Sequence, residues 1–98
     1  MAEEFDVIVI GGGAAGENLA GRVQDGGLTS VVIESELVGG ECSYWACMPS
    51  KALLRPGEAL AVARRVPSVR DAVTGGIDVE KALSSRNAFA SNWDDSGQ

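Results

Sequence analysis

Two short runs of apolar, largely β-branched residues near the start of the chain predict buried strands. The first run is Phe5 to Ile10, interrupted only by Asp6, and the second is Ser30 to Ile33. Continuous apolar runs of this length are typical of parallel strands, which are covered on both faces. Between the runs, residues 14–24 predict a helix. One face of this helix, at spacings of four and three, carries Gly16, Ala20 and Val23. The order strand, helix, strand predicts a βαβ unit and therefore an α/β fold with a parallel sheet.

The second half of the chain has a helical pattern. Residues 52–66 predict one helix, in which Pro56-Gly57 indicates a kink or a restart, and Pro67 ends it. Asp78 is a predicted N-cap for a last helix from Val79 to about Trp93. The side chains expected to face the core from these two helices are Leu53, Leu60, Ala63, Leu83 and Ala90.

A glycine-rich turn joins the first strand to the first helix. Residues 11–16, Gly-Gly-Gly-Ala-Ala-Gly, match G-x-G-x-x-G, and Glu34 ends the second strand eighteen residues after Gly16. This arrangement is the dinucleotide-binding fingerprint. Gly11 permits the tight turn, Gly13 lets a pyrophosphate approach the main chain, and Gly16 allows close helix packing.

The fingerprint also predicts how a ligand is held. The free N–H groups and the dipole at the helix start would bind a diphosphate. Glu34 would accept hydrogen bonds from the adenosine ribose hydroxyls, and its charge would repel a 2′-phosphate, which disfavours NADP at this site. The motif serves NAD and FAD alike, and a glycine-rich turn without a ligand is the alternative interpretation.

The two cysteines of the chain, Cys42 and Cys47, lie close together in sequence. Five residues of regular helix rise by about 7.5 Å, whereas the Cα atoms of a disulfide lie roughly 4.4 to 6.8 Å apart. A disulfide here therefore needs a distorted turn. Pro49 disfavours the helical region for Met48, which places the predicted distortion at this point. Two cysteines without any histidine cannot complete a four-ligand structural zinc site, so a redox pair or two unrelated thiols remain.

Charge and composition exclude several classes of partner. The net charge is −6, and Arg64-Arg65 is the only basic cluster, so neither nucleic acid nor an anionic membrane is an expected partner. The start of the chain is acidic where a secretory peptide would be basic, and Val7 to Ile10 is too short to span a bilayer. A cytoplasmic location is therefore expected.

These motifs resemble the N-terminal segment of the flavin-dependent pyridine nucleotide-disulfide oxidoreductases, the family of dihydrolipoamide dehydrogenase, glutathione reductase and mercuric reductase. The residues that carry the resemblance are Asp6 to Gly16, Glu34 and, above all, Gly39 to Lys51, with the pattern G-G-x-C-x4-C-x-P-S-K. The resemblance implies FAD as cofactor, NAD(P)H as electron donor, and a disulfide or another small molecule as acceptor. It covers the first half of the chain strongly and the remainder weakly.

The resemblance also implies roles for individual residues. Cys47 would lie against the flavin and form the charge-transfer thiolate, Cys42 would be the interchange thiol, and Lys51 would stabilise the reduced flavin. The implied catalytic residues are thus Cys42, Cys47 and Lys51. The implied cofactor-binding residues are Gly11, Gly13, Ala14, Ala15, Gly16, Glu34, Ser35, Gly40, Glu41, Cys47 and Lys51.

The chain departs from the family pattern beside the first cysteine. A threonine is common in the family where this chain has Glu41. Residues 43–46, Ser-Tyr-Trp-Ala, replace the commoner Leu-Asn-Val-Gly type. The two aromatic side chains, Tyr44 and Trp45, are expected to narrow or reshape the substrate approach. Trp45 and Trp93 are both expected to pack against neighbours rather than to bind a ligand.

Two strands are too few for a doubly wound sheet, which predicts that more of the protein exists than residues 1–98. We expect these residues to be the N-terminal portion of an FAD-binding domain, with residues 39–51 as the redox-disulfide segment. In the family, separate NAD(P)H-binding and dimerisation domains complete a homodimer and supply a histidine, which this chain lacks. Residues 1–98 alone are not expected to complete turnover. The alternatives are a non-catalytic dinucleotide-binding module and a dithiol redox switch without flavin.

Overall fold

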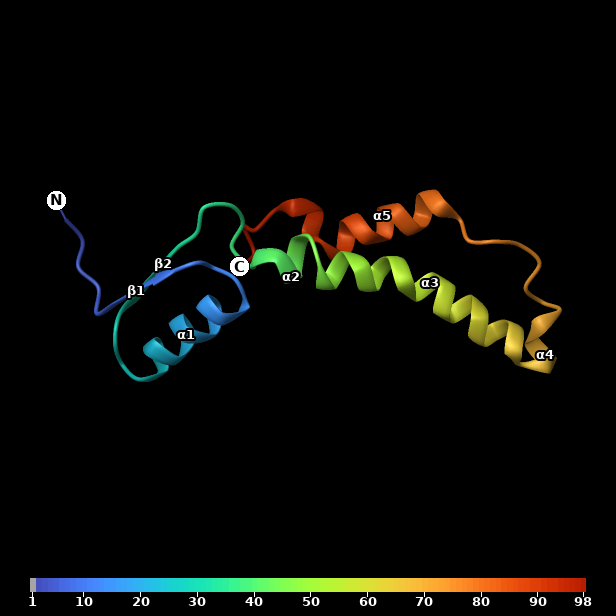
Figure 1. The fold of residues 1–98 in the computed structure, drawn as a ribbon, viewed down its shortest axis with the longest axis horizontal. Coiled ribbons are helices and arrows are strands. Elements are labelled where there is room, and N and C mark those ends of the chain that lie inside the picture. Colours follow the sequence, from blue (N-terminus) through green and yellow to red (C-terminus); the bar gives the residue numbers. More distant parts are fainter. Residues whose placement is uncertain (1) are drawn as a thin grey trace.

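A βαβ unit forms one end of the molecule (Figure 1). The computed structural model describes residues 2–98, and it begins with strand β1 (Val7–Ile10), helix α1 (Ala14–Asp25) and strand β2 (Ser30–Ile33). The two strands pair in parallel, with Val9 opposite Val32. The predicted α/β fold with an incomplete parallel sheet is confirmed, although β1 begins two residues later than the apolar run suggests.

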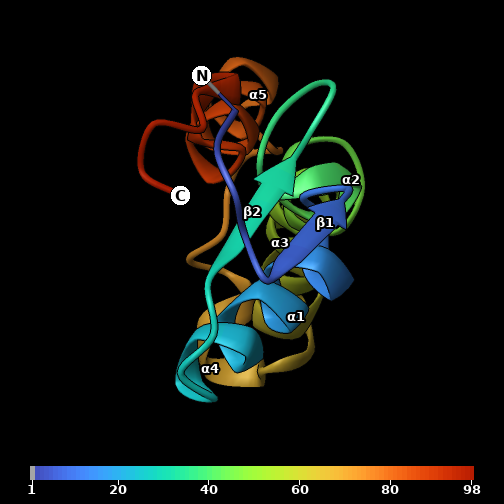
Figure 2. The ribbon, with the colours of Figure 1, turned by 90° about the vertical axis from the view of Figure 1, so that its left-hand side faces the viewer.

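Helix α1 packs along the strand pair through its small residues (Figure 2). Gly16, Ala20 and Val23 are all partly buried, as the spacing predicts. A Cβ added at Gly16 would overlap the carbonyl oxygen of Gly11 and touch the side chain of Val9. Only glycine therefore lets α1 lie this close to the strand that precedes it.

The rest of the chain is helical, and its two longest helices run antiparallel to each other as an arm that extends away from the βαβ unit (Figure 1). The elements are α2 (Gly40–Tyr44), α3 (Cys47–Arg65), α4 (Pro67–Arg70), α5 (Val79–Phe89) and the 3₁₀ turn η1 (Ser91–Trp93). The predicted cap of the last helix is confirmed, because the Asp78 carboxylate accepts a hydrogen bond from the Lys81 N–H at 3.0 Å.

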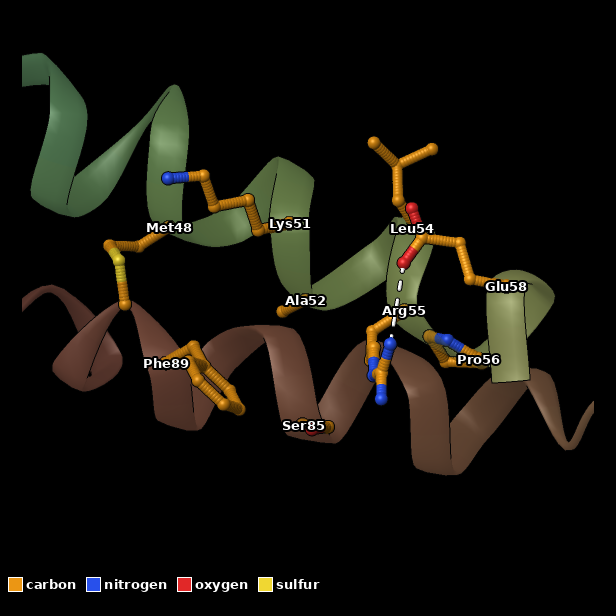
Figure 3. Close-up of a pocket in the computed structure, with 9 residues that line it drawn as sticks. All are labelled: Met48, Lys51, Ala52, Leu54, Arg55, Pro56, Glu58, Ser85 and Phe89. Atoms are coloured by element: carbon orange, nitrogen blue, oxygen red, sulfur yellow. Dashed lines mark ion pairs between the residues drawn. The ribbon is translucent and has the colours of Figure 1, made fainter. Parts of the chain in front are cut away.

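Several details of these helices differ from the prediction. α3 runs without a restart through Pro56. Ala52 and Pro56, four residues apart, lie on the face of α3 that meets α5, so packing maintains the helix despite the lost backbone donor (Figure 3). Leu60 and Ala63 lie on this same face and are partly buried, as predicted. The prediction is wrong for Leu53 and for Leu83 of α5, which are 43% and 40% exposed. α5 ends at Phe89, four residues early, because the next turn is not right-handed.

The molecule is extended and buries little apolar surface. Its Cα radius of gyration is 19.9 Å, whereas a compact chain of this length has about 13 Å. Its accessible area is 7209 Å², against about 5,300 Å² for a compact protein of this mass. Large apolar side chains such as Ile10, 88% exposed, face solvent. Within residues 2–98, no helix combines the length and the apolar character that crossing a membrane requires.

Candidate functional site

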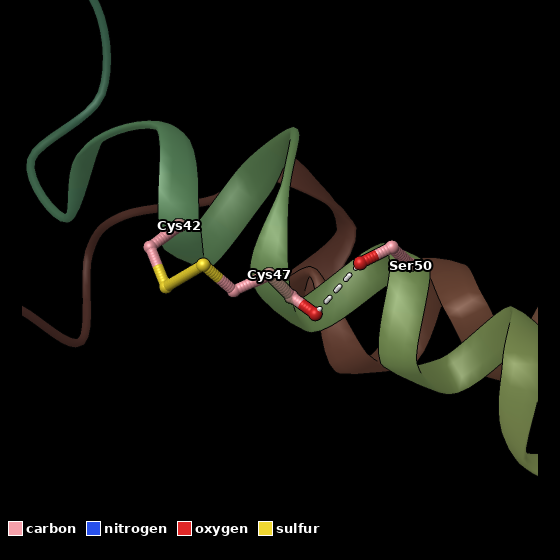
Figure 4. The surroundings of a disulfide bond; sticks show 3 residues. All are labelled: Cys42, Cys47 and Ser50. Atoms are coloured by element: carbon pink, nitrogen blue, oxygen red, sulfur yellow. Dashed lines mark hydrogen bonds between the residues drawn. A yellow bond between two sulfur atoms is a disulfide. The ribbon is translucent and has the colours of Figure 1, made fainter.

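A disulfide joins Cys42 in α2 to Cys47, the first residue of α3 (Figure 4). Their Cα atoms are 4.4 Å apart. α2 ends at Tyr44, and the N–H groups of both Trp45 and Ala46 donate to the carbonyl of Glu41, at 2.9 and 2.6 Å. This double donation folds the chain back on itself and shortens the distance that a regular helix would impose. The prediction that the bridge needs a distorted turn is confirmed.

The distortion lies before Pro49 and not at it. Met48 and Pro49 are both in the first turn of α3, where an N–H has no intrahelical partner, so proline loses nothing there. Ser50 makes the first helical hydrogen bond, to Ala46 at 3.0 Å, and its hydroxyl donates to the Cys47 carbonyl at 3.2 Å (Figure 4). The prediction that Pro49 distorts the turn at Met48 is therefore wrong, and the proline instead supports the start of α3.

The glycine turn presents bare main chain at the start of α1. Gly11 has a φ of 105°, which favours glycine, and Gly13 is the extended N-cap residue without a side-chain cap. A Cβ added at Gly11 or Gly13 would meet nothing within 4 Å. Ala14, Ala15 and Gly16, the first residues of α1, line an open cavity. The first N–H groups of a helix have no intrahelical partner, and the helix start has a positive potential. A diphosphate fits this environment.

The segment that carries the disulfide rests directly on this glycine turn. The Gly39 N–H donates to the Gly12 carbonyl at 2.7 Å. A Cβ added at Gly40 would lie 2.7 Å from the Cα of Gly13. Gly39 and Gly40 have φ values of 124° and 70°, so the main chain here both adopts a conformation that favours glycine and approaches too closely for a side chain.

One open cavity of about 570 Å³ is shared by the glycine turn and the disulfide segment. Its lining consists of Val9, Ile10, Gly11, Gly13, Ala14, Ala15, Gly16, Leu19, Glu41 and Cys42. The structure thus brings together the predicted glycine-turn residues, Glu41 and one of the two sulfurs.

Lys51 lies apart from this cavity. It lines a groove of about 370 Å³ between α3 and α5, together with residues such as Met48 and Phe89 (Figure 3). Its side chain runs back along α3 towards the N-terminal end of that helix. Lys51 and Cys47 are four residues apart in α3 and so occupy the same helical face.

Glu34 holds the glycine turn in shape. Its carboxylate accepts hydrogen bonds from the N–H groups of Gly12 at 2.5 Å, Ser35 at 2.9 Å and Glu36 at 3.1 Å. The Gly12 N–H, followed by the Glu36 N–H, lowers the pKa of Glu34. A carboxylate offers about four acceptor positions, so one remains for a ribose hydroxyl. The sequence motif indicates only the ligand-binding role and gives no sign of this structural one.

The structure also identifies residues that the sequence pattern does not indicate. Tyr44 is 1% exposed, and its hydroxyl donates to the Val38 carbonyl at 2.9 Å, so the prediction that it shapes the substrate approach is wrong. Trp45 is exposed beside it. The indole N–H of Trp93 donates to the Tyr44 carbonyl at 3.0 Å, and the Asp95 carboxylate accepts from the Val38 N–H at 2.7 Å. The sole signal in the sequence is that Tyr44 stands between the two cysteines.

The comparisons with known proteins point to one family. A family model described as pyridine nucleotide-disulphide oxidoreductase matches residues 5–93. The dihydrolipoyl dehydrogenases of Bacillus subtilis and Rhizobium etli are 47% and 48% identical over 64 and 60 residues, which cover 65% and 61% of this chain. The soluble pyridine nucleotide transhydrogenase of Vibrio vulnificus is 51% identical over 53 residues, or 53% of this chain. The chain spans only 14%, 12% and 11% of these relatives, respectively.

Proposed function

The chain belongs to the pyridine nucleotide-disulphide oxidoreductase family, and on this premise we propose that it forms the flavin-binding, disulfide-bearing part of an FAD-dependent oxidoreductase. Electrons would pass from NAD(P)H through FAD to the Cys42–Cys47 disulfide and on to a disulfide or similar small-molecule acceptor. The observation that supports this proposal most strongly is the direct backbone contact between Gly39-Gly40 and the glycine turn. This contact supports the proposal because Cys42 lies next to the glycine turn that would hold the diphosphate.

The residues of the glycine turn would hold the FAD diphosphate. The N–H groups of Ala14, Ala15 and Gly16 would bind it at the positive end of α1, and Gly13 leaves room for its approach. Glu34 would use its remaining acceptor position for a ribose hydroxyl, with Ser35 next to it. Gly40 and Glu41 would line the cofactor where it passes the disulfide segment.

A bound flavin supplies two-electron chemistry, because it accepts hydride from a nicotinamide and can pass the electron pair to a disulfide. Two electrons and two protons break the Cys42–Cys47 bond and leave two thiols. The Cys42 thiolate then attacks one sulfur of the acceptor disulfide and displaces the first acceptor thiolate. The Cys47 thiolate attacks the Cys42 sulfur, displaces the second acceptor thiolate and re-forms the bond. The two protons lost by the cysteine thiols end on the two acceptor thiolates, which leave as thiols. Lys51, on the same helical face as Cys47, supplies a positive charge that favours the thiolate.

The proposal also concerns the rest of the protein. We place residues 1–98 in the N-terminal portion of an FAD-binding domain, with residues 39–51 as its redox segment. NAD(P)H binding, dimerisation and complete turnover would require further domains, and the working protein would be a homodimer. A cytoplasmic location is part of the same proposal.

Absorbance of the chain reconstituted with FAD tests the two cysteine roles. Cys42→Ser leaves Cys47 as a free thiolate beside the flavin, so we expect a long-wavelength band beyond the absorbance of the flavin itself. Cys47→Ser should not show this band. The reverse pattern would exchange the two roles, and loss of the band from both variants with FAD bound would remove Cys47 from the flavin.

The same experiment separates the proposal from its alternatives. A dithiol redox switch without flavin predicts that the chain does not bind FAD at all. If the chain is a non-catalytic dinucleotide-binding module, it should bind FAD, and neither cysteine substitution should change the absorbance spectrum of the bound FAD. The disulfide observed next to the glycine turn is what favours an electron-transfer role over this second alternative.

A further inference from the structure

The last residues of the chain return to the disulfide turn and fasten it. Trp93 donates its indole N–H to the Tyr44 carbonyl at 3.0 Å, and the Asp95 carboxylate accepts from the Val38 N–H at 2.7 Å. The Tyr44 hydroxyl closes the set by donating to the Val38 carbonyl at 2.9 Å. We call these four residues, Val38, Tyr44, Trp93 and Asp95, the latch. The two fastened positions, 38 and 44, bracket Gly39 to Ser43 and therefore Cys42.

Tyr44 is well placed to control the disulfide because it lies between the two cysteines. It is 1% exposed, and its carbonyl lies at the end of α2, where carbonyls have no intrahelical partner. The indole of Trp93 supplies that partner. Burial, together with the charge of Asp95, raises the pKa of Tyr44, so the hydroxyl stays protonated and able to donate.

An unusual backbone conformation brings Trp93 to this position. Ser91, Asn92 and Trp93 have φ values of 52°, 50° and 56°, the left-handed region that residues with a Cβ disfavour. Such a conformation persists only where surrounding contacts hold it. Ala90 is fully buried at its start, and the Arg86 guanidinium lies 5.8 Å from the centre of the Trp93 ring. The reversed turn aims the indole back at α2, 49 residues earlier in the chain.

We propose that Trp93 and Asp95 are positioning residues for the Cys42–Cys47 pair. By holding Tyr44 and Val38, they keep the Cys42 segment against the glycine turn and within bonding distance of Cys47. Without the latch, Cys42 samples more positions, its effective concentration near Cys47 falls, and the dithiol becomes more favourable relative to the disulfide. The inference rests on the proposed function only in taking this disulfide as the one that cycles.

The test is the thiol–disulfide equilibrium of the 98-residue chain in glutathione buffers, without flavin. In the titrated reaction, two glutathione thiols reduce the Cys42–Cys47 bond and become one glutathione disulfide. Trp93→Phe keeps an aromatic ring but removes the N–H donor. We expect its equilibrium constant to shift about three- to tenfold towards the dithiol, the effect of one hydrogen bond. Asp95→Ala should shift it in the same direction.

Two further variants separate positioning from general damage. Asp95→Asn keeps an acceptor oxygen and should restore an equilibrium constant close to that of the unmodified chain. Asp94→Ala is the matched control, because the Asp94 carboxylate accepts from the Ser96 N–H and is not part of the latch. If Trp93→Phe and Asp95→Ala keep both the native circular dichroism spectrum and the original equilibrium constant, the inference is wrong.

A second measurement avoids disturbing the latch. Trp45 and Trp93 are the only tryptophans, and Trp45 is exposed, so Trp45→Phe leaves Trp93 as the sole indole reporter. We expect its fluorescence to change across the glutathione titration with the same midpoint as the thiols. If the Trp93 fluorescence is the same in the disulfide and dithiol states, the inference is wrong. Neither measurement involves FAD. If the latch inference is wrong, the long-wavelength flavin band can still be observed. If the flavin band is absent, the shift in the thiol–disulfide equilibrium can still be measured.

Discussion

Gly40 shows at the residue scale how the lack of a side chain permits a close contact between two backbone segments. Its φ of 70° is disfavoured for other residues, and a Cβ in its place would lie 2.7 Å from the Cα of Gly13. The neighbouring atom belongs to the backbone, so it cannot rotate away as a flexible side chain would. The distance between the disulfide segment and the glycine turn is therefore set by the absence of a side chain at this position.

We expect Gly40→Ala to destabilise the chain by about 1 to 3 kcal/mol, from the strained φ and the displaced backbone. It should also weaken FAD binding, because the two halves of the proposed site separate. Urea unfolding and flavin titration measure the two effects. Gly21→Ala in α1 is the matched control, since nothing lies within 4 Å of its added Cβ. It should stabilise the helix by about 0.5 to 1 kcal/mol.

Glu34 gives a prediction for the pH dependence of folding. Backbone hydrogen bonds lower its pKa from the ordinary value of 4.5. Its contribution to stability is thus fully present above that ordinary value and is lost as the pH falls through the lowered, folded-state pKa. Glu34→Gln keeps an acceptor oxygen but has no charge. In this variant the free energy of unfolding should fall less steeply as the pH is lowered. Some loss of stability in acid should remain in this variant, because hydrogen bonds from Thr29 and Ser96 also lower the pKa values of Asp6 and Asp94.

Unfolding free energies measured from neutral pH down to about pH 3 test this prediction. Glu36→Gln serves as the control, because the Glu36 side chain makes no hydrogen bond within residues 2–98. If the free energy of unfolding falls equally steeply with pH in the Glu34→Gln variant and in the unmodified chain, the Gly12 contact does not stabilise the folded turn.

At the scale of elements, the βαβ unit can be predicted from the sequence because its causes are local. The β-branched runs, the G-x-G-x-x-G turn and Glu34 lie within one short segment. The disulfide turn is also local, and its need for distortion follows from the cysteine spacing. Its location does not, because the distortion arises from the double donation to the Glu41 carbonyl and not from Pro49.

Long-range packing determines what the sequence does not reveal. Pro56 would end an isolated helix, yet the face that it shares with Ala52 packs on α5 and keeps α3 continuous. The contact between Trp93 and Tyr44 joins residues 49 apart through a left-handed turn that no local pattern encodes. The predicted length of the last helix fails for the same reason.

The N-cap of α5 gives a prediction for a single element. Asp78→Ala removes the acceptor for the Lys81 N–H and should destabilise the chain by about 0.5 to 2 kcal/mol. The exposed ion pair between the same two side chains should add little. Asp78→Ser, which retains a capping oxygen, should recover most of the loss. Thermal unfolding measures all three, and equal melting temperatures for the alanine and serine variants would contradict a capping role.

At the scale of the whole molecule, the chain is an arm attached to a partial sheet. Its core consists of a few residues. Among them, Tyr44 is the large side chain that is fully buried. Apolar residues such as Ile8, Ile10 and Leu54 are exposed over both the sheet and the arm. The organisation of the site thus depends on hydrogen bonds and close backbone contacts more than on a hydrophobic core.

The extended shape can be measured directly. Small-angle X-ray scattering from the monomeric chain should give a radius of gyration near the 19.9 Å of the structure. A value near the roughly 13 Å of a compact protein of this length would show that α3 and α5 fold back onto the sheet in solution. Sedimentation analysis of the same sample supplies the control, because self-association would raise the radius for another reason.

The hydrogen bond from Gly39 to Gly12 and that from Trp93 to Tyr44 have a consequence for protein engineering. A synthetic peptide of residues 39–51 would contain both cysteines and Lys51 but neither outside anchor. Transplanting the redox motif into a foreign scaffold therefore means moving three separate stretches of sequence together, the glycine turn, the cysteine segment and the returning tryptophan.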